Sequence, residues 1–375
     1  MKILIQHRHL KHEIAGVLTY IDAITPELEQ RGVTVQTVST RADKIHQWVK
    51  LIAGADIIHM NSNDLLFALL CKLFNKKIII KYHYCFYQSI HSHYEQMTFV
   101  QRLKTEFYHT LPKANYPLKW KLFTLVKWAR LATRITTALV ADSHTACSNF
   151  LGESCAFPWK VATLYNPIAV RSPIQQKQLN TLANPDKFVF VGRLDKDKGV
   201  DILLQAASIL KKENRQFQIE IIGDGPKAAE LKQLTSDLEL TNCVTFLGKL
   251  PNSEVIVKLQ DALALVAPSR WQDPAPYVVL EAASTQTCAI VSQMGGLPEM
   301  AGSQGFFFEN EDFRGLATCM RYCLEHPEEV IQRGVMASQY VAEKFSAHSA
   351  ATQLLDICQQ LIPMDSSQLA NAQLR

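Results

Sequence analysis

Along the first half of the chain, short apolar runs typical of strands take turns with stretches whose apolar residues recur every three to four positions, the spacing typical of helices. The runs that predict strands are 2–6 (KILIQ), 33–39 (VTVQTVS), 55–60 (ADIIHM) and 76–84 (KKIIIKYHY). The runs that predict helices are 17–32 (VLTYIDAITPELEQRG), ended by its last residue, Gly32, and 64–74 (DLLFALLCKLF). Strands that alternate with helices form a mostly parallel sheet, so the pattern predicts an α/β fold.

This rhythm is interrupted between about residues 86 and 134, a stretch rich in Tyr, His, Trp and Lys, and resumes with TALVADS at 137–143. A polar segment with two prolines, 169–187, is typical of a linker. Six further strands are predicted after it, at 187–192 (KFVFVG), 217–226 (FQIEIIGDGP), 244–248 (VTFLG), 262–269 (ALALVAPS), 288–293 (CAIVSQ) and 305–310 (GFFFEN). We therefore predict two doubly wound, Rossmann-like domains that face each other across a cleft, residues 1–168 and 169–375, with a final helix at about 340–362 that packs back on the first domain.

Length and composition agree with this prediction. A chain of 375 residues with 47% hydrophobic and 20% charged residues is typical of a two-domain globular protein. No apolar run approaches the ~18 residues of a membrane span, and Gln6 and His7 interrupt the apolar start of the chain too early for a signal peptide. Nine cysteines without paired spacing indicate reduced thiols. We expect a cytoplasmic protein.

Charge is distributed unevenly. Residues 1–165 contain 20 Lys and Arg against 11 Asp and Glu, a balance of +9, whereas the remainder contains 19 against 24, a balance of −5. The basic half is expected to face an anionic partner. Its segment Lys113–Arg134 mixes cations with aromatic residues and contains no acid, which predicts either a helix lying on an anionic membrane surface or an amphipathic helix packed on the first domain. No recognition motif for nucleic acid accompanies the charge.

The loop between the strand at 187–192 and the next helix contains the first candidate chemistry. Arg193 and Lys198 lie where ligands bind in open α/β sheets, beside a helix N-terminus near Gly199 whose N–H groups favour anions. Two glycines in IGDGP (222–226) permit close backbone approach. A diphosphate site is one interpretation, and a solvated pair bonded to the neighbouring aspartates is the other.

Five motifs follow one another in the second half: GRLDKDKG (192–199), GDGP (223–226), FLG (246–248), DPAPYVVLEA (273–282) and GGLPE (295–299). Each motif is weak evidence alone, but five in order are strong. On these motifs the chain resembles the retaining glycosyltransferases of family 4, which have the two-domain GT-B fold. Looser counterparts in the first half, such as DIIHMNS and YNPI, extend the resemblance.

The resemblance implies a role for each matching residue. Arg193 and Lys198 would hold the diphosphate of a nucleotide-sugar donor, Glu281 the ribose hydroxyls and Asp273 the hydroxyls of the transferred sugar. From the first domain, Gly16 would offer a backbone N–H to the diphosphate and His83 would lie near the reacting sugar. His59 resembles a second such histidine, although a histidine that ends a strand is more often structural. The remaining donor-binding positions implied are Gly192, Gly223, Gly225, Leu250, Pro276, Tyr277 and Val278.

Fixed cations at the departing phosphate favour the transition state over the ground state, so this chemistry requires no metal and no cofactor beyond the nucleotide-sugar co-substrate. The DKD tripeptide at 195–197 imitates a metal-binding Asp-x-Asp but lies inside the Gly-Arg-Leu loop. The expected partners are the donor and a glycan or lipid-linked acceptor at the inner membrane face, with peripheral attachment there. The insertion at 82–102 would shape the acceptor pocket.

Three departures from the family pattern concern Ala15 in place of a glycine, Asp273 in place of Glu, and Ala275-Pro276 in place of Phe-Gly. The Ala15 and Asp273 departures keep open a sugar-nucleotide-binding or scaffold protein at the membrane that has no turnover. A GT-B epimerase or phosphorylase is a further alternative, against which the pattern of Arg193, Lys198 and Glu281 argues.

Overall fold

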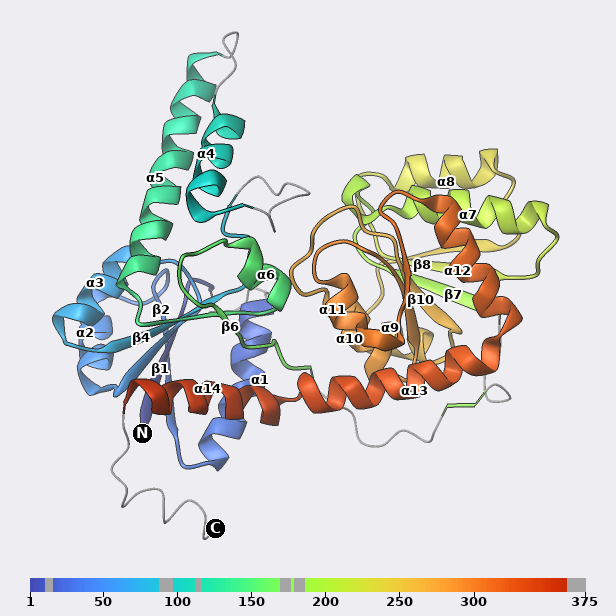
Figure 1. Ribbon diagram of the computed structural model, residues 1–375. Helices are drawn as coiled ribbons and strands as arrows, with labels where there is room; N and C mark the ends of the chain where they lie inside the picture. The colour runs from blue at the N-terminus through green and yellow to red at the C-terminus, as the bar shows by residue number, and fades with distance from the viewer. Residues whose placement is uncertain (11–15, 88–96, 112–116, 169–176, 179–185, 363–375) are drawn as a thin grey trace. The chain divides into compact units, whose positions relative to one another are not determined.

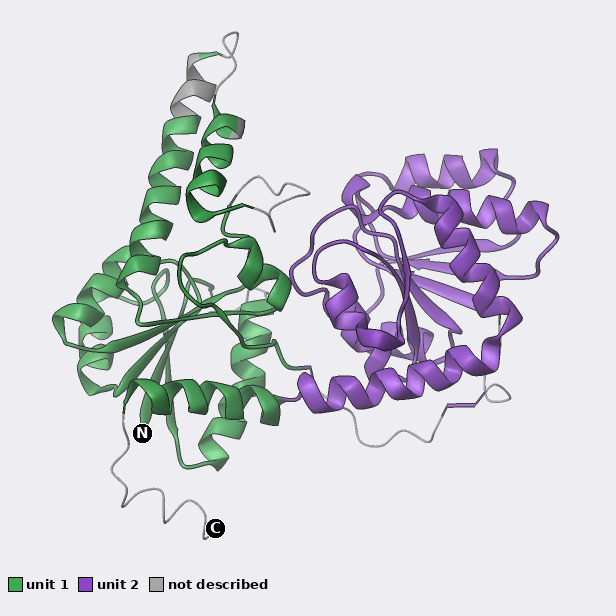
Figure 2. Cartoon of the chain, viewed as in Figure 1, with its two compact units in different colours: residues 1–167, 347–375 green, residues 168–346 purple. Residues whose placement is uncertain are grey.

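The computed structural model describes residues 1–10, 16–87, 97–111, 117–168, 177–178 and 186–362. The chain divides into two compact units (Figure 2), unit 1 with residues 1–167 and 347–375 and unit 2 with residues 168–346. The last segment of the chain therefore belongs to the same unit as the first.

The described residues of unit 1 form one parallel sheet of six strands in the order β2-β1-β3-β4-β5-β6 (Figure 1). The strands are β1 (Lys2–His7), β2 (Thr34–Ser39), β3 (Ile57–Met60), β4 (Lys77–Tyr82), β5 (Ser143–Ala146) and β6 (Ala162–Thr163). The helices are α1 (Gly16–Gln30), α2 (Ile45–Gly54), α3 (Leu65–Leu73), α4 (Phe99–Thr110), α5 (Leu118–Val140), α6 (Asn149–Ser154) and α14 (Ala347–Leu361). The α/β architecture predicted from the periodicity is confirmed.

The C-terminal helix α14 completes the core of unit 1. Its buried side chains pack with those of α1, β1, β3 and β4 in one apolar cluster, to which α14 contributes Ala350, Ala351, Leu354 and Cys358. The helix is amphipathic because these residues recur at helical spacing.

The described residues of unit 2 form a second parallel sheet of six strands, in the order β12-β11-β10-β7-β8-β9. The strands are β7 (Lys187–Val191), β8 (Gln218–Ile222), β9 (Val244–Gly248), β10 (Ala264–Ala267), β11 (Cys288–Ser292) and β12 (Phe306–Phe308). The α-helices are α7 (Val200–Lys212), α8 (Ala228–Asp237), α9 (Asn252–Gln260), α10 (Tyr277–Ser284), α11 (Leu297–Ala301), α12 (Phe313–Glu325) and α13 (Pro327–Lys344). Two short 3₁₀ turns are η3 (Lys196–Lys198) and η4 (Gly302–Gln304). All six predicted strand positions of this half are confirmed.

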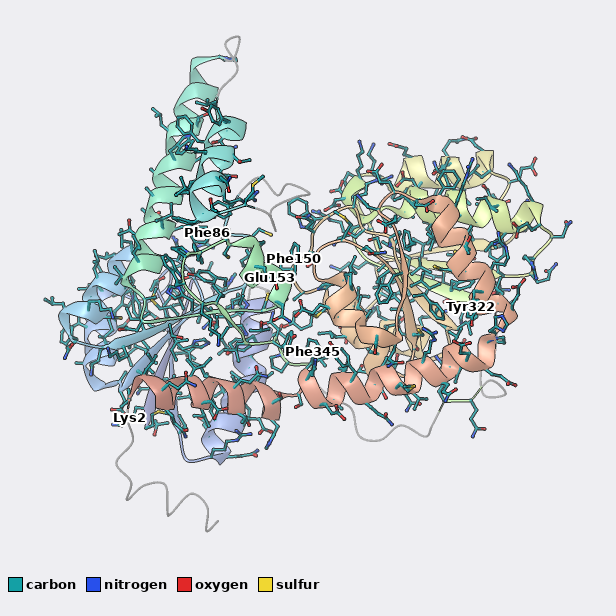
Figure 3. All side chains as sticks on the ribbon, in the orientation of Figure 1. Lys2, Phe86, Phe150, Glu153, Tyr322 and Phe345 are labelled. Carbon is teal, nitrogen blue, oxygen red and sulfur yellow. The ribbon has the colours of Figure 1, made fainter. Side chains whose placement is uncertain are left out.

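The described residues of the interruption in the first half belong mainly to two helices, α4 and α5, which lie side by side in Figure 1 and are called the α4–α5 hairpin here. Phe107 of α4 and Trp128 of α5 meet edge to face, with ring centroids 4.3 Å apart. Arg134 of α5 donates to the carbonyl oxygen of Phe86 (2.9 Å), a residue labelled in Figure 3. The sequence pattern did not predict α4.

The prediction that the alternation of strands and helices resumes at TALVADS (137–143) is wrong about where the strand begins. Thr137 and Ala138 are buried and continue the inward face of α5, so the helix runs to Val140 and strand β5 begins only at Ser143. Of the basic segment 113–134, residues 113–116 and the side chains of residues 118–123, which include Lys119, Trp120, Lys121 and Phe123, lie outside the described residues.

None of the described helices is long and apolar enough to cross a lipid bilayer. Every cysteine is a free thiol, and most are buried.

Candidate functional site

The strand order of unit 2 creates a crevice between β7 and β10. These strands are neighbours, but the chain continues from β7 to one side of the sheet and from β10 to the other. Ligands bind at such a switch point, outside the carboxyl ends of the strands. A cavity of about 260 Å³ lies there. Among the residues that line it are Gly192, Lys198, Asp273, Pro276, Tyr277 and Val278, all of them expected site residues.

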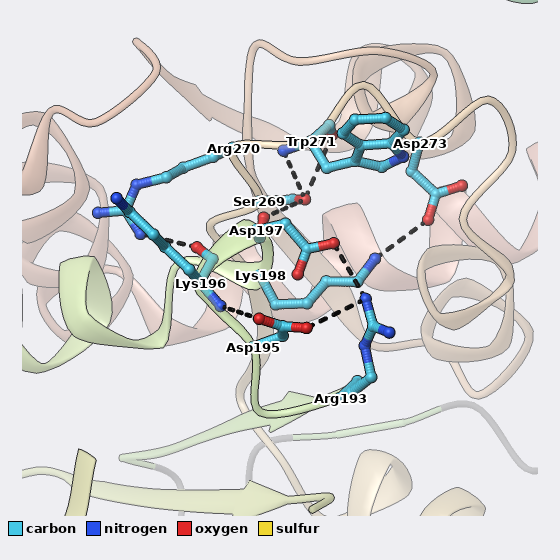
Figure 4. Close-up of polar contacts among 9 residues, drawn as sticks. All are labelled: Arg193, Asp195, Lys196, Asp197, Lys198, Ser269, Arg270, Trp271 and Asp273. Atoms are coloured by element: carbon cyan, nitrogen blue, oxygen red, sulfur yellow. Dashed lines mark hydrogen bonds and ion pairs between the residues drawn. The ribbon is translucent and has the colours of Figure 1, made fainter. Parts of the chain in front are cut away.

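The two expected cations each bind a carboxylate in this region (Figure 4). The Nζ atom of Lys198 lies 3.2 Å from Oδ2 of Asp273. The guanidinium of Arg193 lies 3.5 Å from Asp195 and 3.3 Å from Asp197, and its side chain is 61% exposed. The pairs of the exposed Arg193 are weak, so an anionic ligand can replace the two carboxylates as the partner of this cation.

The loop that carries the cations is fixed by its backbone to the loop after β10. The carbonyl oxygen of Asp197 accepts hydrogen bonds from the backbone N–H groups of Arg270 (2.8 Å) and Trp271 (3.2 Å) and from Oγ of Ser269 (3.1 Å). Arg270 also forms a bidentate ion pair with Asp201 of α7, at 2.7 Å for each bond. These contacts set Lys198 and Asp273 opposite each other.

The two aspartates of the DKD tripeptide make their contacts within this same loop. Asp195 accepts a hydrogen bond from the backbone N–H of Lys196 (2.8 Å) and so caps η3, and both acids face Arg193. Within the described ranges, no group of three or more His, Cys, Asp or Glu side chains is arranged to hold a metal ion.

The glycines of GDGP bring two loops into contact. A Cβ atom on Gly223, whose φ is +140°, would lie 1.8 Å from the carbonyl oxygen of Gly192, and one on Gly225 would lie 2.4 Å from that of Leu194. The loops are joined by the hydrogen bonds Gly192 N–H to Ile222 O (3.0 Å) and Leu194 N–H to Asp224 O (2.9 Å). In the structure these glycines therefore pack the β8–α8 loop against the loop that carries the cations, rather than lining the cavity.

Glu281 lies in the second turn of α10, on the helix that begins beside the cavity. Its Oε1 atom accepts a hydrogen bond of 2.9 Å from Nδ2 of Asn252, the first residue of α9. Leu250 precedes this residue in the short loop that follows β9. Sequence reasoning missed Asn252, because an asparagine after a proline signals only the start of a helix.

In unit 1, Gly16 is the first residue of α1, and His83 directly follows β4. Nε2 of His83 lies 2.9 Å from Oδ1 of Asn61, the residue after β3. Burial, reinforced by the nearby Lys81 and then by His59 and His9, holds the pKa of His83 well below its ordinary value. The imidazole is therefore neutral at neutral pH.

His59 is enclosed in the core of unit 1. It is fully buried, and its Nε2 atom lies 3.0 Å from the hydroxyl of Tyr20. Burial, with the nearby Lys81 as a second cause, lowers its pKa to about 3. These contacts favour the structural interpretation of His59. Lys81 is buried beside it, with Nζ 3.3 Å from the ring centre of Tyr20 and 3.3 Å from the carbonyl oxygen of Tyr165.

The expected site residues thus divide between the units. Gly16 and His83 belong to unit 1 and all the others to unit 2, where the cavity brings six of them together. Ala15 lies outside the described residues.

Comparison with known proteins supports the placement of the donor-binding motifs in unit 2. Residues 172–337 match the model of a family described as "Glycosyl transferases group 1". The chain is 27% identical over 192 residues to the amylovoran biosynthesis glycosyltransferase AmsK of Erwinia amylovora, an alignment that covers 49% of this chain and 47% of the relative. It is 30% identical over 186 residues to a glycogen synthase of Mycobacterium tuberculosis, which covers 49% and 44%. The chain thus matches less than half of the length of these relatives.

The fold is similar to that of solved structures along nearly the whole chain. The crystal structure of Anabaena HepE in complex with UDP superposes with a TM-score of 0.70, covering 96% of this chain and 100% of that one, at 17% sequence identity. At this identity the likeness establishes the fold alone.

Proposed function

From the premise that this chain belongs, through residues 172–337, to the glycosyl transferases group 1 family and has the GT-B fold, we propose that it transfers a sugar from a nucleoside-diphosphate sugar to an acceptor, with retention of anomeric configuration. The observation that carries the proposal is the meeting of Lys198 and Asp273 at one cavity, with Arg193 on the same loop.

In the proposed reaction the bond between the anomeric carbon and the diphosphate oxygen breaks, and the acceptor oxygen bonds to that carbon from the same face. The acceptor's proton passes to the departing phosphate, so no protein nucleophile is needed. Arg193 and Lys198 stabilise the charge that develops on the phosphate. Asp273 accepts hydrogen bonds from hydroxyls of the transferred sugar.

From the family resemblance, we propose that two groups of unit 1 also bind the donor. The N-terminal turn of α1, beginning at Gly16, offers backbone N–H groups to the diphosphate. His83 contacts the transferred sugar as a neutral imidazole, which avoids placing a further positive charge beside an oxocarbenium-like centre. Its low pKa supports this role.

A thermal-shift screen of the purified protein against UDP, GDP, ADP and their common sugars tests the donor site. We take UDP as the first ligand, because HepE was crystallised with it. A ligand present at about 100 times its Kd stabilises a folded protein by about 2.7 kcal/mol, which raises Tm by several degrees. We expect this shift for one nucleotide and its loss in Lys198→Ala. No shift with any nucleotide at millimolar concentration would refute the diphosphate site.

Turnover separates the transferase from a protein that only binds sugar nucleotides. Transfer or slow hydrolysis of the sugar nucleotide that collapses in Arg193→Ala, while the variant still folds, supports catalysis. Tight binding without turnover across many acceptors would instead support the scaffold function, and epimerised donor as the product would support the epimerase.

We further propose that the acceptor is a glycan or a lipid-linked molecule presented at an anionic membrane surface, to which the α4–α5 hairpin attaches. The only carboxylate between residues 97 and 141 is Glu106, which is 2% exposed. The outward side of α4 carries Val100 and Tyr108, and Leu111 caps the end of the helix; these residues are 59%, 70% and 43% exposed, and the exposed Lys104 lies between the first two. Apolar residues with interspersed cations and no exposed acid are complementary to anionic headgroups.

We thus include α4 in the surface proposed to attach to the membrane, beside the basic segment. On α5, Leu125 and Val126 are exposed, as is Arg130. These residues lie on the side of α5 opposite to Leu131 and Ala138, which are buried.

Vesicle flotation tests this attachment. We expect the protein to float with vesicles of phosphatidylglycerol and phosphatidylcholine, to bind weakly to phosphatidylcholine alone, and to lose binding as salt rises. The double variant Tyr108→Glu/Leu111→Glu should lose most of this binding. Leu73→Glu is the matched control, since Leu73 is an 80% exposed leucine at the end of α3. Equal binding by both variants, or no binding to anionic vesicles, would contradict the proposal.

A further inference from the structure

The side chain of Asn252 connects two helices of unit 2, α9 and α10, that no motif links. Asn252 begins α9, and Glu281 lies in α10, 29 positions later in the chain. The amide Nδ2 atom donates to the carboxylate Oε1 atom over 2.9 Å, a good length for a charge-assisted bond.

This bond restricts a side chain that would otherwise have several rotamers. A glutamate carboxylate has three rotatable bonds between it and the backbone, and a ligand that binds it must fix all three. A donor that already holds one oxygen fixes the plane of the carboxylate before the ligand arrives.

The same residue lies two positions after Leu250, in the loop that follows β9. Gly248 ends that strand with φ +68°, a conformation that turns the chain sharply, and Pro251 caps α9. Asn252 therefore ties the carboxylate on α10 to the end of this loop.

We infer that Asn252 is a positioning residue for the nucleoside of the donor, which holds the Glu281 carboxylate in the orientation that receives the two ribose hydroxyls. The inference rests on the proposed function, and it adds that recognition of the ribose depends on a residue outside the family motifs. Asn252 itself does not contact the sugar nucleotide.

Isothermal titration with a nucleotide and its 2′,3′-dideoxy form tests this inference. The probes are UDP, or GDP or ADP if the wild type prefers one of these, and the corresponding dideoxynucleoside diphosphate. We expect Asn252→Ala to weaken binding of the ribonucleotide about tenfold, the scale of one hydrogen bond to a charged group, and to leave the dideoxy form unchanged. Ser253→Ala, at the exposed next position of the same helical turn, should change neither.

A double-mutant cycle isolates the contact between the two side chains. In a Glu281→Gln background, Asn252→Ala should cause little further loss of ribonucleotide binding, because the carboxylate that it orients is gone. Asn252→Asp, which keeps the shape of the side chain but replaces its donor with a second carboxylate, should weaken binding at least as much as Asn252→Ala.

The outcomes distinguish the inference from the proposed function. Equal losses for the ribo and dideoxy ligands, or additive losses in the cycle, would show that Asn252 serves only the fold and would overturn the inference while the donor site stands. No nucleotide binding by the folded wild type would overturn both.

Discussion

Lys198 and Asp273 are held together at 3.2 Å, although the proposed chemistry gives them different targets. The lysine is expected to bind the diphosphate and the aspartate a sugar hydroxyl. Because Asp273 has one methylene fewer than the glutamate usual in the family, its carboxylate lies closer to the backbone. The ion pair with Lys198 therefore holds the carboxylate toward the loop that follows β7.

This pairing predicts a split in the kinetics of Asp273→Asn. The substitution frees Lys198 from its carboxylate, so the Kd for the nucleoside diphosphate should stay the same or fall by up to about fivefold, as expected for a weak ion pair. The kcat for transfer should fall about tenfold or more, since a charged acceptor for the sugar hydroxyl is lost. Titration calorimetry and initial rates measure the two effects. A large loss of nucleotide affinity would contradict the proposed division of roles.

The low pKa of His59 predicts that the free energy of unfolding of unit 1 falls in acid. Burial lowers its pKa to about 3 from an ordinary value of 6.5, so the unfolded chain binds the proton first as pH falls. The contribution of His59 to stability is complete above about pH 6.5 and is lost progressively below it, by about 2 kcal/mol at pH 5. Urea unfolding followed by tryptophan fluorescence reports mainly on unit 1, which contains Trp48, Trp120, Trp128 and Trp159.

The control for this prediction is His59→Gln, which cannot titrate. Its loss of stability between pH 7 and pH 5 should be smaller than that of the wild type by about the same 2 kcal/mol. Identical pH dependence in the two proteins would mean that other groups, such as the similarly depressed His83, account for the acid sensitivity.

At the level of the elements, the loop after β7 and the loop after β8 pack against each other and are joined by backbone hydrogen bonds. Gly223 and Gly225 permit this close contact. Gly223→Ala places a methyl group where the carbonyl of Gly192 lies, in a backbone conformation that alanine rarely adopts. We expect it to destabilise unit 2 by about 3 kcal/mol or more, to lower its Tm by about 6 °C or more and to abolish nucleotide binding.

The matched control is Gly248→Ala. Gly248 also has a positive φ, +68°, but no atom lies within 4 Å of the added methyl. Only the backbone penalty of about 1–2 kcal/mol applies there. Calorimetry of both variants checks the prediction, and similar melting temperatures would show that the contact between the loops is unimportant.

Sequence periodicity predicted the strands because a parallel sheet buries both faces of its strands, which makes them continuous apolar runs. It failed at α4, where charged and apolar positions do not separate in the usual way. Arg102 and Glu106 are buried whereas Val100 and Tyr108 are exposed, so the residue types do not divide α4 into an apolar inner face and a polar outer face. At β5 the buried Thr137 and Ala138 extended the helical spacing beyond the expected boundary.

The candidate site was predictable where motifs mark loops. The five motifs lie within residues 172–337, which match the model of the glycosyl transferases group 1 family. The bonds of Lys198 to Asp273 and of Asn252 to Glu281 were not predictable, because each joins residues that are far apart in the chain. The roles of Arg193, Lys198 and Glu281 remain predictions.

At the level of the whole molecule, unit 1 is built from both ends of the chain. A chain that stops at Ser346 lacks α14 and exposes the apolar faces of α1 and β1 that Leu354 and its neighbours cover. At roughly 1.5–3 kcal/mol for each large buried side chain, we expect unit 1 to lose on the order of 5 kcal/mol. A chain that stops at residue 362 is the control and should retain its stability in urea. Equal stability of the two truncated chains would contradict the assignment of α14 to unit 1.

The position of α14 also has a consequence for the order of events during synthesis. The ribosome completes the first 167 residues early, but their hydrophobic cluster stays uncovered until residues 347–361 have left the exit tunnel. Unit 2, which is continuous in the chain, can finish folding before the unit that precedes it. The nascent protein therefore presents an open apolar surface for the entire time that unit 2 is being made, and chaperone contacts during translation should concentrate on the first half of the chain.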